Sequence, residues 1–210
     1  MSDTGPKPRK IGTDEASNAI GESLRLIIDT IPTMVWSVRP DGAVDFVNQR
    51  WLDYTGLTLE EEVEDPTRAL HPEDLPRVME KWLVDMAAGK PSEDEMRLQR
   101  ADGEYCWFLV RTAPLRDERG TIVKWYGVSI DIEDRKRAES QSRTLLDAIP
   151  QQIWSGPADG TLDYCNERWR SNMGLGLEEL QGDGWQSVLH PDDRERVLRA
   201  WHVSVANGTP

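Results

Sequence analysis

The chain has 210 residues, of which 38% are hydrophobic and 30% are charged, a composition that suits a soluble globular protein of one or two domains. Its formal net charge of −13 argues against nucleic acid as a partner, because the binding of phosphates needs a basic surface. No apolar run reaches the roughly 18 residues that cross a membrane, no signal peptide begins the chain, and the two cysteines form no disulfide framework, so we expect a cytoplasmic protein.

The first elements predicted from the sequence are a helix and a hairpin. Residues 1–13 contain proline, glycine and lysine with little apolar content, which predicts disorder. Apolar residues then recur at helical spacing over 14–31, and Pro32 ends that helix. The strands 34–38 and 43–47 follow, joined by a Pro-Asp-Gly turn in which glycine suits a positive φ.

Helices are predicted between the hairpin and the next strands. Asn48 caps a short helix that Gly56 ends, a second helical piece spans 59–63, and the clearest helix spans 73–88. The run of acidic residues over 60–65 overlaps the second piece. We interpret this run as a solvated helix end rather than an acid–base site, because catalytic carboxylates need burial to shift their pKa.

Three antiparallel strands are predicted next, over 93–100, 104–115 and 121–130, with tight turns between them. The alternation of side chains along the middle strand places Cys106 and Phe108 on one face of the sheet. Two strands, then helices, then three strands predict an α+β fold in which the helices cover one face of the sheet.

A mostly polar helix is predicted to follow directly over 132–148, with Asp131 and Asp134 at its start and Pro150 after its end. At about 1.5 Å per residue this helix would be about 25 Å long. It lies between two copies of one sequence, so it is either a spacer or a lever. Its direct continuity with the strand 121–130 favours the lever, because distortion of the sheet would then move the helix.

The chain repeats itself: residues 28–60 recur from residue 146 at an offset of 118, which becomes 119 after one inserted residue. This repeat implies two copies of one fold. The second copy stops at Pro210 and lacks a counterpart of residues 92–131. We therefore expect the chain to be the front part of a longer polypeptide or a shortened open reading frame, with a less stable second copy. The recurring tryptophans are Trp36, Trp51 and Trp82, which return as Trp154, Trp169 and Trp201.

The order of elements and a series of short motifs resemble the PAS fold with its C-terminal PAC segment, in the fold-3 variant common in bacterial sensor proteins. The resemblance covers nearly all of 22–137 and, in truncated form, 146–210. The motifs are Trp36-Ser-Val, Asp41-Gly42, Val47-Asn48, Trp51, Tyr54-Thr-Gly56, His71-Pro-Glu-Asp74, Glu95-Met-Arg97-Leu, Asp102-Gly103, Trp107, Asp117-Glu-Arg-Gly120, Gly127-Val128 and Asp131-Ile-Glu-Asp-Arg-Lys136.

The resemblance implies a five-stranded antiparallel sheet with helices on one face. It implies a PAS domain over 14–131, a connecting helix over 132–148, and a partial second PAS domain over 149–210. Such pairs usually lie upstream of a histidine kinase core, and less often of a cyclic-di-nucleotide enzyme.

The function implied is therefore that of a cytoplasmic sensory module in a two-component sensor histidine kinase. Such a module senses a small molecule, forms a homodimer through its terminal helices, and relays a signal through the connecting helix to a C-terminal output domain. The alternative is a redox or light sensor that carries flavin or haem. The sequence contains no Ser/His/Asp arrangement, no phosphate loop and no kinase core, so whether an enzyme is present remains open.

The resemblance also implies a small-molecule pocket between the sheet and the helices. The three recurring tryptophans favour a filled core over a pocket wall, so we expect the pocket to be small or closed. No cofactor and no metal is predicted, because His71 and His190 each suit a loop before a helix and no second ligand recurs at ligand spacing. The candidate pocket residues are Trp36, Phe46, Trp51, Tyr54, Trp82, Met86, Cys106, Phe108 and Trp125.

Overall fold

The computed structural model describes residues 13–208, so the disorder predicted for residues 1–13 falls, apart from Thr13, outside the described residues. The chain divides into a first unit, which ends at Asp134, and a second unit, which begins at Arg135. Within the described residues, no helix combines the length and the apolar content that a membrane span needs.

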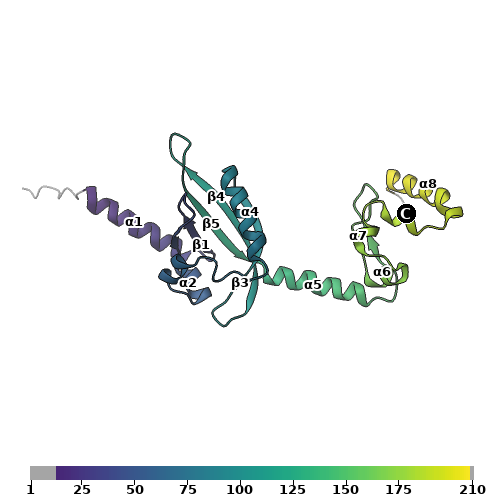
Figure 1. Ribbon diagram of the computed structural model, residues 1–210, viewed down its shortest axis with the longest axis horizontal. Helices are drawn as coiled ribbons and strands as arrows, with labels where there is room; N and C mark the ends of the chain where they lie inside the picture. The colour runs from purple at the N-terminus through teal and green to yellow at the C-terminus, as the bar shows by residue number, and fades with distance from the viewer. Residues whose placement is uncertain (1–12, 209–210) are drawn as a thin grey trace, which may run out of the picture. The chain divides into compact units, whose positions relative to one another are not determined.

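A five-stranded antiparallel sheet forms the centre of the first unit, which confirms the predicted fold class (Figure 1). Its strands are β1 (Met34–Val38), β2 (Val44–Val47), β3 (Ser92–Gln99), β4 (Tyr105–Arg116) and β5 (Ile122–Asp131). They lie in the order β2-β1-β5-β4-β3, so the N-terminal hairpin pairs with the last strand of the unit.

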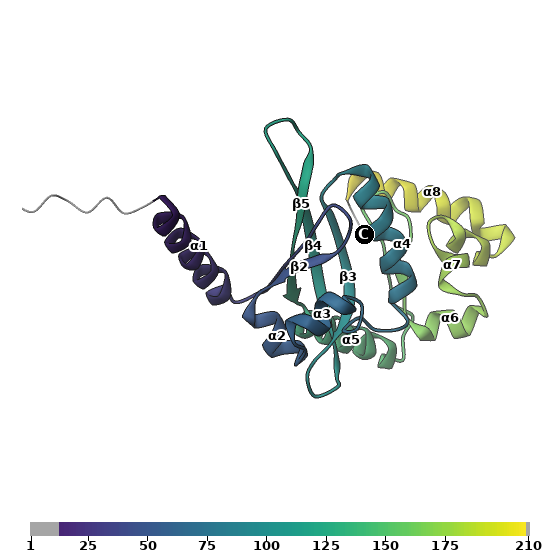
Figure 2. The same cartoon turned by 60° about the vertical axis from the view of Figure 1, so that its left-hand side comes forward.

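The helices that precede β3 in the first unit are α1 (Thr13–Thr30), α2 (Gln49–Thr55), α3 (Leu59–Glu64) and α4 (Leu75–Ala88). The Asn48 side chain caps α2, and Thr58 and Glu61 form a reciprocal capping box at the start of α3. The helix α4 runs alongside the sheet (Figure 1 and Figure 2), with Pro76 in its first turn, where a missing N–H costs little. Side-chain caps therefore determine where α2 and α3 begin.

The core of the first unit lies on the sheet face that α3 and α4 cover. Along β4, the side chains of Cys106, Phe108, Val110 and Thr112 are buried, whereas those that alternate with them are partly or fully exposed. This pattern confirms the two faces predicted for the strand. The buried apolar cluster consists of Met34, Val47, Trp51, Leu70, Met96, Leu98, Cys106, Phe108 and Val110.

The second unit contains the connecting helix and the beginning of a second copy of the fold. The helix α5 (Glu133–Ala148) leads into it, and its further elements are β6 (Trp154–Ser155), β7 (Tyr164–Cys165), α6 (Glu167–Met173), α7 (Leu177–Leu180), η1 (Gly184–Val188) and α8 (Pro191–Asn207). The strands β6 and β7 form a two-stranded sheet. Trp154 on β6 is 47% exposed, whereas its counterpart Trp36 in the first unit is partly buried.

Both units begin with the same set of hydrogen bonds around a buried asparagine, here called the asparagine clasp. In the first unit, Asn48 Nδ2 donates to the carbonyl of Ile28 at the end of α1 (3.1 Å), and Asn48 Oδ1 accepts from the N–H of Val35 on β1 (3.0 Å). In the second unit, Asn166 makes the corresponding bonds to Leu146 at the end of α5 (3.1 Å) and to Ile153 (3.1 Å). The repeated sequence therefore folds into a repeated structure.

Candidate ligand pocket

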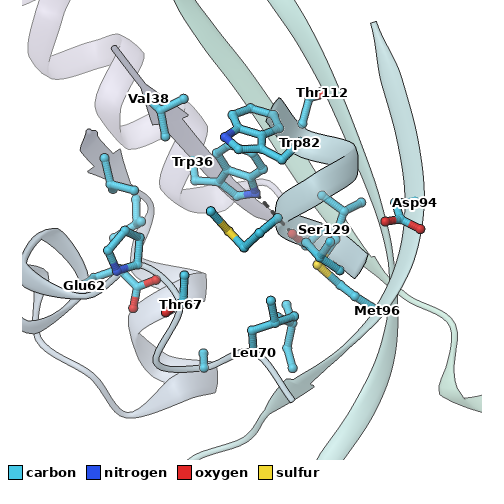
Figure 3. Close-up of a pocket in the computed structure, with 18 of the residues that line it drawn as sticks. Trp36, Val38, Glu62, Thr67, Leu70, Trp82, Asp94, Met96, Thr112 and Ser129 are labelled. Carbon is cyan, nitrogen blue, oxygen red and sulfur yellow. Dashed lines mark hydrogen bonds between the residues drawn. The ribbon is translucent and has the colours of Figure 1, made fainter. Parts of the chain in front are cut away.

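A cavity of about 190 Å³ lies between the inner face of the sheet and the helices α3 and α4 of the first unit (Figure 3). The sheet contributes Trp36, Met96 and Ser129, and the helices contribute Glu62 and Trp82. The lining is mainly apolar, as in most small-molecule sites of proteins.

Three of the nine candidate pocket residues, Trp36, Trp51 and Trp82, line this cavity. The other six lie elsewhere in the first unit. Cys106 belongs to the buried cluster, Trp125 is buried beneath Trp82, and Phe108 packs edge to face on Tyr54 with ring centroids 5.0 Å apart. Phe46 and Met86 are partly buried outside the cavity lining.

Trp36 and Trp82 line one side of the cavity, and the buried Trp125 packs against Trp82. Trp82 packs edge to face between Trp36 and Trp125, with centroid distances of 6.0 Å and 5.8 Å. The Trp36 indole N–H donates to Ser129 Oγ (3.2 Å), which ties the ring to β5. Trp36 and Trp82 therefore both line the cavity and pack on other aromatic rings of the first unit.

Gly127 on β5 lets Trp36 lie against the sheet. The two residues are directly paired across β1 and β5, and a Cβ atom at position 127 would overlap the six-membered ring of Trp36. A glycine within a strand often marks such a close approach.

Glu62 corrects the interpretation of the acidic run as wholly solvated. Its side chain is only 1% exposed and lines the cavity, whereas Glu60 and Glu64 on the same helix are exposed. The turn of α3 explains the difference, because residues two apart on a helix point to different sides. Burial raises the pKa of the Glu62 carboxyl to about 7, and the charge of Asp65 adds to that shift.

Three buried polar atoms of the cavity lining have no hydrogen-bond partner among the described residues. Glu62 Oε2, Trp51 Nε1 and Thr112 Oγ1 are buried and have no hydrogen bond to any residue that the structure describes. The Trp51 indole lies close enough to oppose the rise in the Glu62 pKa, but without the geometry of a hydrogen bond. Buried polar groups of this kind are rare in proteins and call for an explanation.

The other charged residues that line the cavity are paired. Lys81 Nζ contacts Asp85 Oδ2 (2.6 Å) and donates to Ser92 Oγ (3.0 Å). Asp94 accepts two bonds from Arg77 Nη1, at 2.6 Å and 2.8 Å. Both sets connect α4 to β3, and they leave the charge of Glu62 without an opposite charge among the described lining residues.

The histidines considered as ligands in the sequence lie at helix starts. His71 Nδ1 accepts from the N–H of Glu73 (3.2 Å), and His190 Nδ1 accepts from that of Asp192 at the start of α8 (3.3 Å). No group of three or more His, Cys, Asp or Glu side chains within the described part of the chain is placed to hold a metal ion. The chemistry that the cavity offers is binding through an apolar wall and a few polar atoms.

The model of the PAS fold family matches residues 44–129 and 162–210. The chain belongs to the PAS fold family. It is 34% identical over 197 residues to the uncharacterized protein y4lL of Sinorhizobium fredii, a match that covers 90% of this chain and 24% of that protein. It is 33% identical over 189 residues to the peroxide stress-activated histidine kinase mak1 of Schizosaccharomyces pombe, covering 83% of this chain and 12% of that one.

Structural comparison agrees with this PAS assignment. The structure of an RNA-binding light-oxygen-voltage receptor superposes with a TM-score of 0.54 at 18% identity, over 66% of this chain and 40% of that one, which shows the fold alone. Relatives of this PAS chain include histidine kinases and two-component sensors, and the chain spans a quarter or less of the two relatives described above.

Proposed function

We propose that this PAS chain is a sensory input region of a two-component sensor histidine kinase, in which the first unit binds a small molecule and α5 relays the change. The proposal comprises a PAS domain over 14–131, a connecting helix over 132–148 and a partial PAS domain over 149–210. The relatives that are histidine kinases and two-component sensors support a histidine kinase as the output domain. The enzyme would then be the parent protein that contains both this region and the kinase domain. We place it in the cytoplasm.

The junction between β5 and α5 carries this proposal. The N–H of Ile132 donates to the carbonyl of Trp107 on β4 (2.9 Å), and the N–H of Trp107 donates to the Glu133 carboxylate (3.0 Å). Asp131 Oδ1 accepts from the N–H of Glu133 (2.8 Å) and so caps the new helix. A shift of β4 or β5 on ligand binding would therefore move the first turn of α5.

The other end of α5 is bound to the second copy of the fold. Asp147 Oδ1 accepts from the N–H of Glu167 (2.7 Å), next to the clasp that Asn166 makes with Leu146. The helix α1 holds the first unit in the same way through Asp29 and Gln49 (2.9 Å). These bonds support a relay role for α5, because its first turn is hydrogen-bonded to the first copy of the fold and its last turn to the second copy.

Exposed apolar side chains on the terminal helices support a homodimer. On α1, Leu24, Leu26 and Ile27 are more than half exposed, and on α5 Leu145 is 69% exposed. Helices of this kind commonly bury such residues against a partner helix. A homodimer through these helices would bring two copies of the relay together.

The size of the cavity favours a ligand smaller than flavin or haem. Pockets for drug-sized ligands measure about 300–1,000 Å³, whereas this cavity measures about 190 Å³. Of the two cysteines, Cys106 belongs to the core cluster and lies outside the cavity lining. We therefore propose an unmodified small molecule as the signal.

Insertions into α5 of the complete gene product test the relay. One, two or three residues inserted between Arg137 and Thr144 rotate the following chain by about 100° each. We expect kinase autophosphorylation to vary with helical phase, and a seven-residue insertion, which adds nearly two full turns, to restore most of the original response. Activity that falls steadily with insertion length, without phase, would instead indicate a spacer.

A further inference from the structure

We infer that the cavity of the first unit binds a small organic cation, an ammonium or amidinium group on a compact apolar body, with Glu62 as its counter-ion. This inference rests on the proposed sensory function and adds the chemical class of the signal. Its first observation is that the Glu62 carboxyl is almost completely buried, faces the cavity and has an unpartnered oxygen (Figure 3).

The second copy of the fold shows that the protein does not need a carboxyl at this position. The N–H of Thr58 donates to the Glu61 carboxylate at the start of α3 (2.9 Å), and the N–H of Gly176 donates to the Glu179 carboxylate at the start of α7 (2.8 Å), so the two helices correspond residue by residue. Leu180 then occupies the position of Glu62, and it is 0% exposed.

A leucine therefore fills the same buried position in the repeat. Burying a carboxyl without a hydrogen-bond partner destabilises a fold relative to leaving it in water. Glu62 destabilises the fold at a position where the repeat has leucine. This difference points to a role of Glu62 in binding.

The surroundings of Glu62 favour a cation over a neutral or anionic ligand. Trp36, Trp51 and Trp82 border the cavity, and the face of a tryptophan attracts organic cations. The other charged residues of the cavity lining are already balanced, because Lys81 is paired with Asp85 and Asp94 with Arg77, while Asp65 follows α3 and adds negative charge. An anion would be repelled by this set of charges.

The volume limits the apolar body of the ligand to about one ring. An apolar cavity of about 150 Å³ is known to hold benzene, and this one measures about 190 Å³. The Trp51 N–H and the Thr112 hydroxyl, also unpartnered within the described residues, would orient the ligand. Because the empty pocket favours the protonated carboxyl, a bound cation would displace that proton, and affinity should rise with pH between about 6 and 8.

Titration of the 210-residue chain with ring-sized probes tests the inference. Benzylammonium and benzamidinium are the cations, and benzyl alcohol and benzoate are the neutral and anionic controls, each followed by tryptophan fluorescence and NMR in a buffer free of amines. We expect both cations to bind at least about tenfold more tightly than benzyl alcohol, since a hydrogen bond to a charged group contributes that much.

Variants assign the effect to Glu62. Glu62→Gln and Glu62→Leu should each weaken cation binding by about tenfold or more, and Glu62→Leu should fold because the repeat holds leucine there. Glu64→Gln, which removes an exposed carboxylate from the same helix, should leave binding unchanged.

Three results would each overturn the inference. The first is benzyl alcohol binding as tightly as the cations, the second is Glu62→Gln binding the cations normally, and the third is no binding of either cation at millimolar concentration. The relay through α5 is tested independently of all three, because the insertion experiment measures kinase output without reference to the ligand's charge.

Discussion

At the scale of single residues, the Glu62 carboxyl links folding to pH. Its pKa is raised from 4.5 to about 7 by burial. The unfolded chain releases this proton as the pH passes about 4.5, whereas the folded chain keeps it until about 7. The free energy of unfolding should therefore fall as the pH rises between these values and stay lower above them.

The Glu62→Gln variant should lose this dependence, because an amide stays neutral. Relative to the wild type, we expect its free energy of unfolding to increase by roughly 2 kcal/mol between about pH 5 and about pH 8, since one pKa unit is worth about 1.4 kcal/mol. Denaturant unfolding followed by tryptophan fluorescence measures this. Glu64→Gln is the control, and a Glu62→Gln difference that is the same at both pH values would contradict the prediction.

The sequence predicted part of the pocket at this scale. The recurrence of Trp36, Trp51 and Trp82 in the second copy predicts that they belong to the core or the pocket. The acidic run around Glu62 instead predicts an exposed side chain, because such runs are usually solvated. The signal that identifies it is the repeat itself, in which the corresponding residue is Leu180. Comparing the two copies position by position separates the buried member of the run from its exposed neighbours.

At the scale of the elements, the pairing of β1 with β5 depends on Gly127. Gly127→Ala should reduce the free energy of unfolding by about 1–3 kcal/mol, because its Cβ would overlap the Trp36 ring and force β1 or the ring to shift. Thermal unfolding of the chain measures the loss.

Gly21→Ala provides the matched control for that substitution. Gly21 lies in α1, where a Cβ meets nothing within 4 Å, so alanine should be neutral or stabilise by about 0.5–1 kcal/mol. Equal melting temperatures for Gly127→Ala and the wild type would show that the sheet tolerates a wider spacing at Trp36.

The strands and long helices of the first unit, and the connecting helix α5, could be predicted from the sequence to within one or two residues. The clearest case is β4, whose alternation of side chains follows directly from burial on one face. The cavity could not be derived in this way, because it depends on how α3 and α4 pack on the sheet. The paired side chains that connect α4 to β3, such as Arg77 with Asp94, lie 17 positions apart and leave no periodic signal.

At the scale of the whole molecule, the two copies of the fold differ in the size of their cores. Among the residues whose burial the structure describes, the cluster in the first unit contains nine residues, and that in the second contains Leu162, Cys165, Trp169 and Leu180. The paired strands β6 and β7 are two residues long, and an isolated pair of strands is at best marginally stable in water.

Amide hydrogen exchange on the intact chain should therefore divide it into two parts. We expect amides of β4 and β5 to exchange at least about tenfold more slowly than those of α6 and α8, because opening the larger core costs more free energy. Within the second unit, amides next to Asn166 should be the best protected. Equal protection of α6 and β4 would mean that the second copy is stabilised by contacts not expected from its core.

The overall fold of the first unit could be predicted from the sequence, because the strand, turn and helix signals all agree with the element order of the PAS fold. The repeat located the second copy, and the structure reproduces its first elements and its asparagine clasp. The sequence left the arrangement of side chains inside the cavity undetermined, since the strands and helices that line it are spread along the chain from β1 to β5.

The asparagine clasp has a consequence for how such proteins are assembled in series. Asn48 fastens α1 to the first unit with the same bonds by which Asn166 fastens α5 to the second. The same hydrogen bonds therefore join a preceding helix to the domain in both copies. Gene duplication in steps of one repeat can then add or remove a domain without any change in these bonds. Different buried residues can then follow one common connector, as Glu62 in the first copy and Leu180 in the second illustrate.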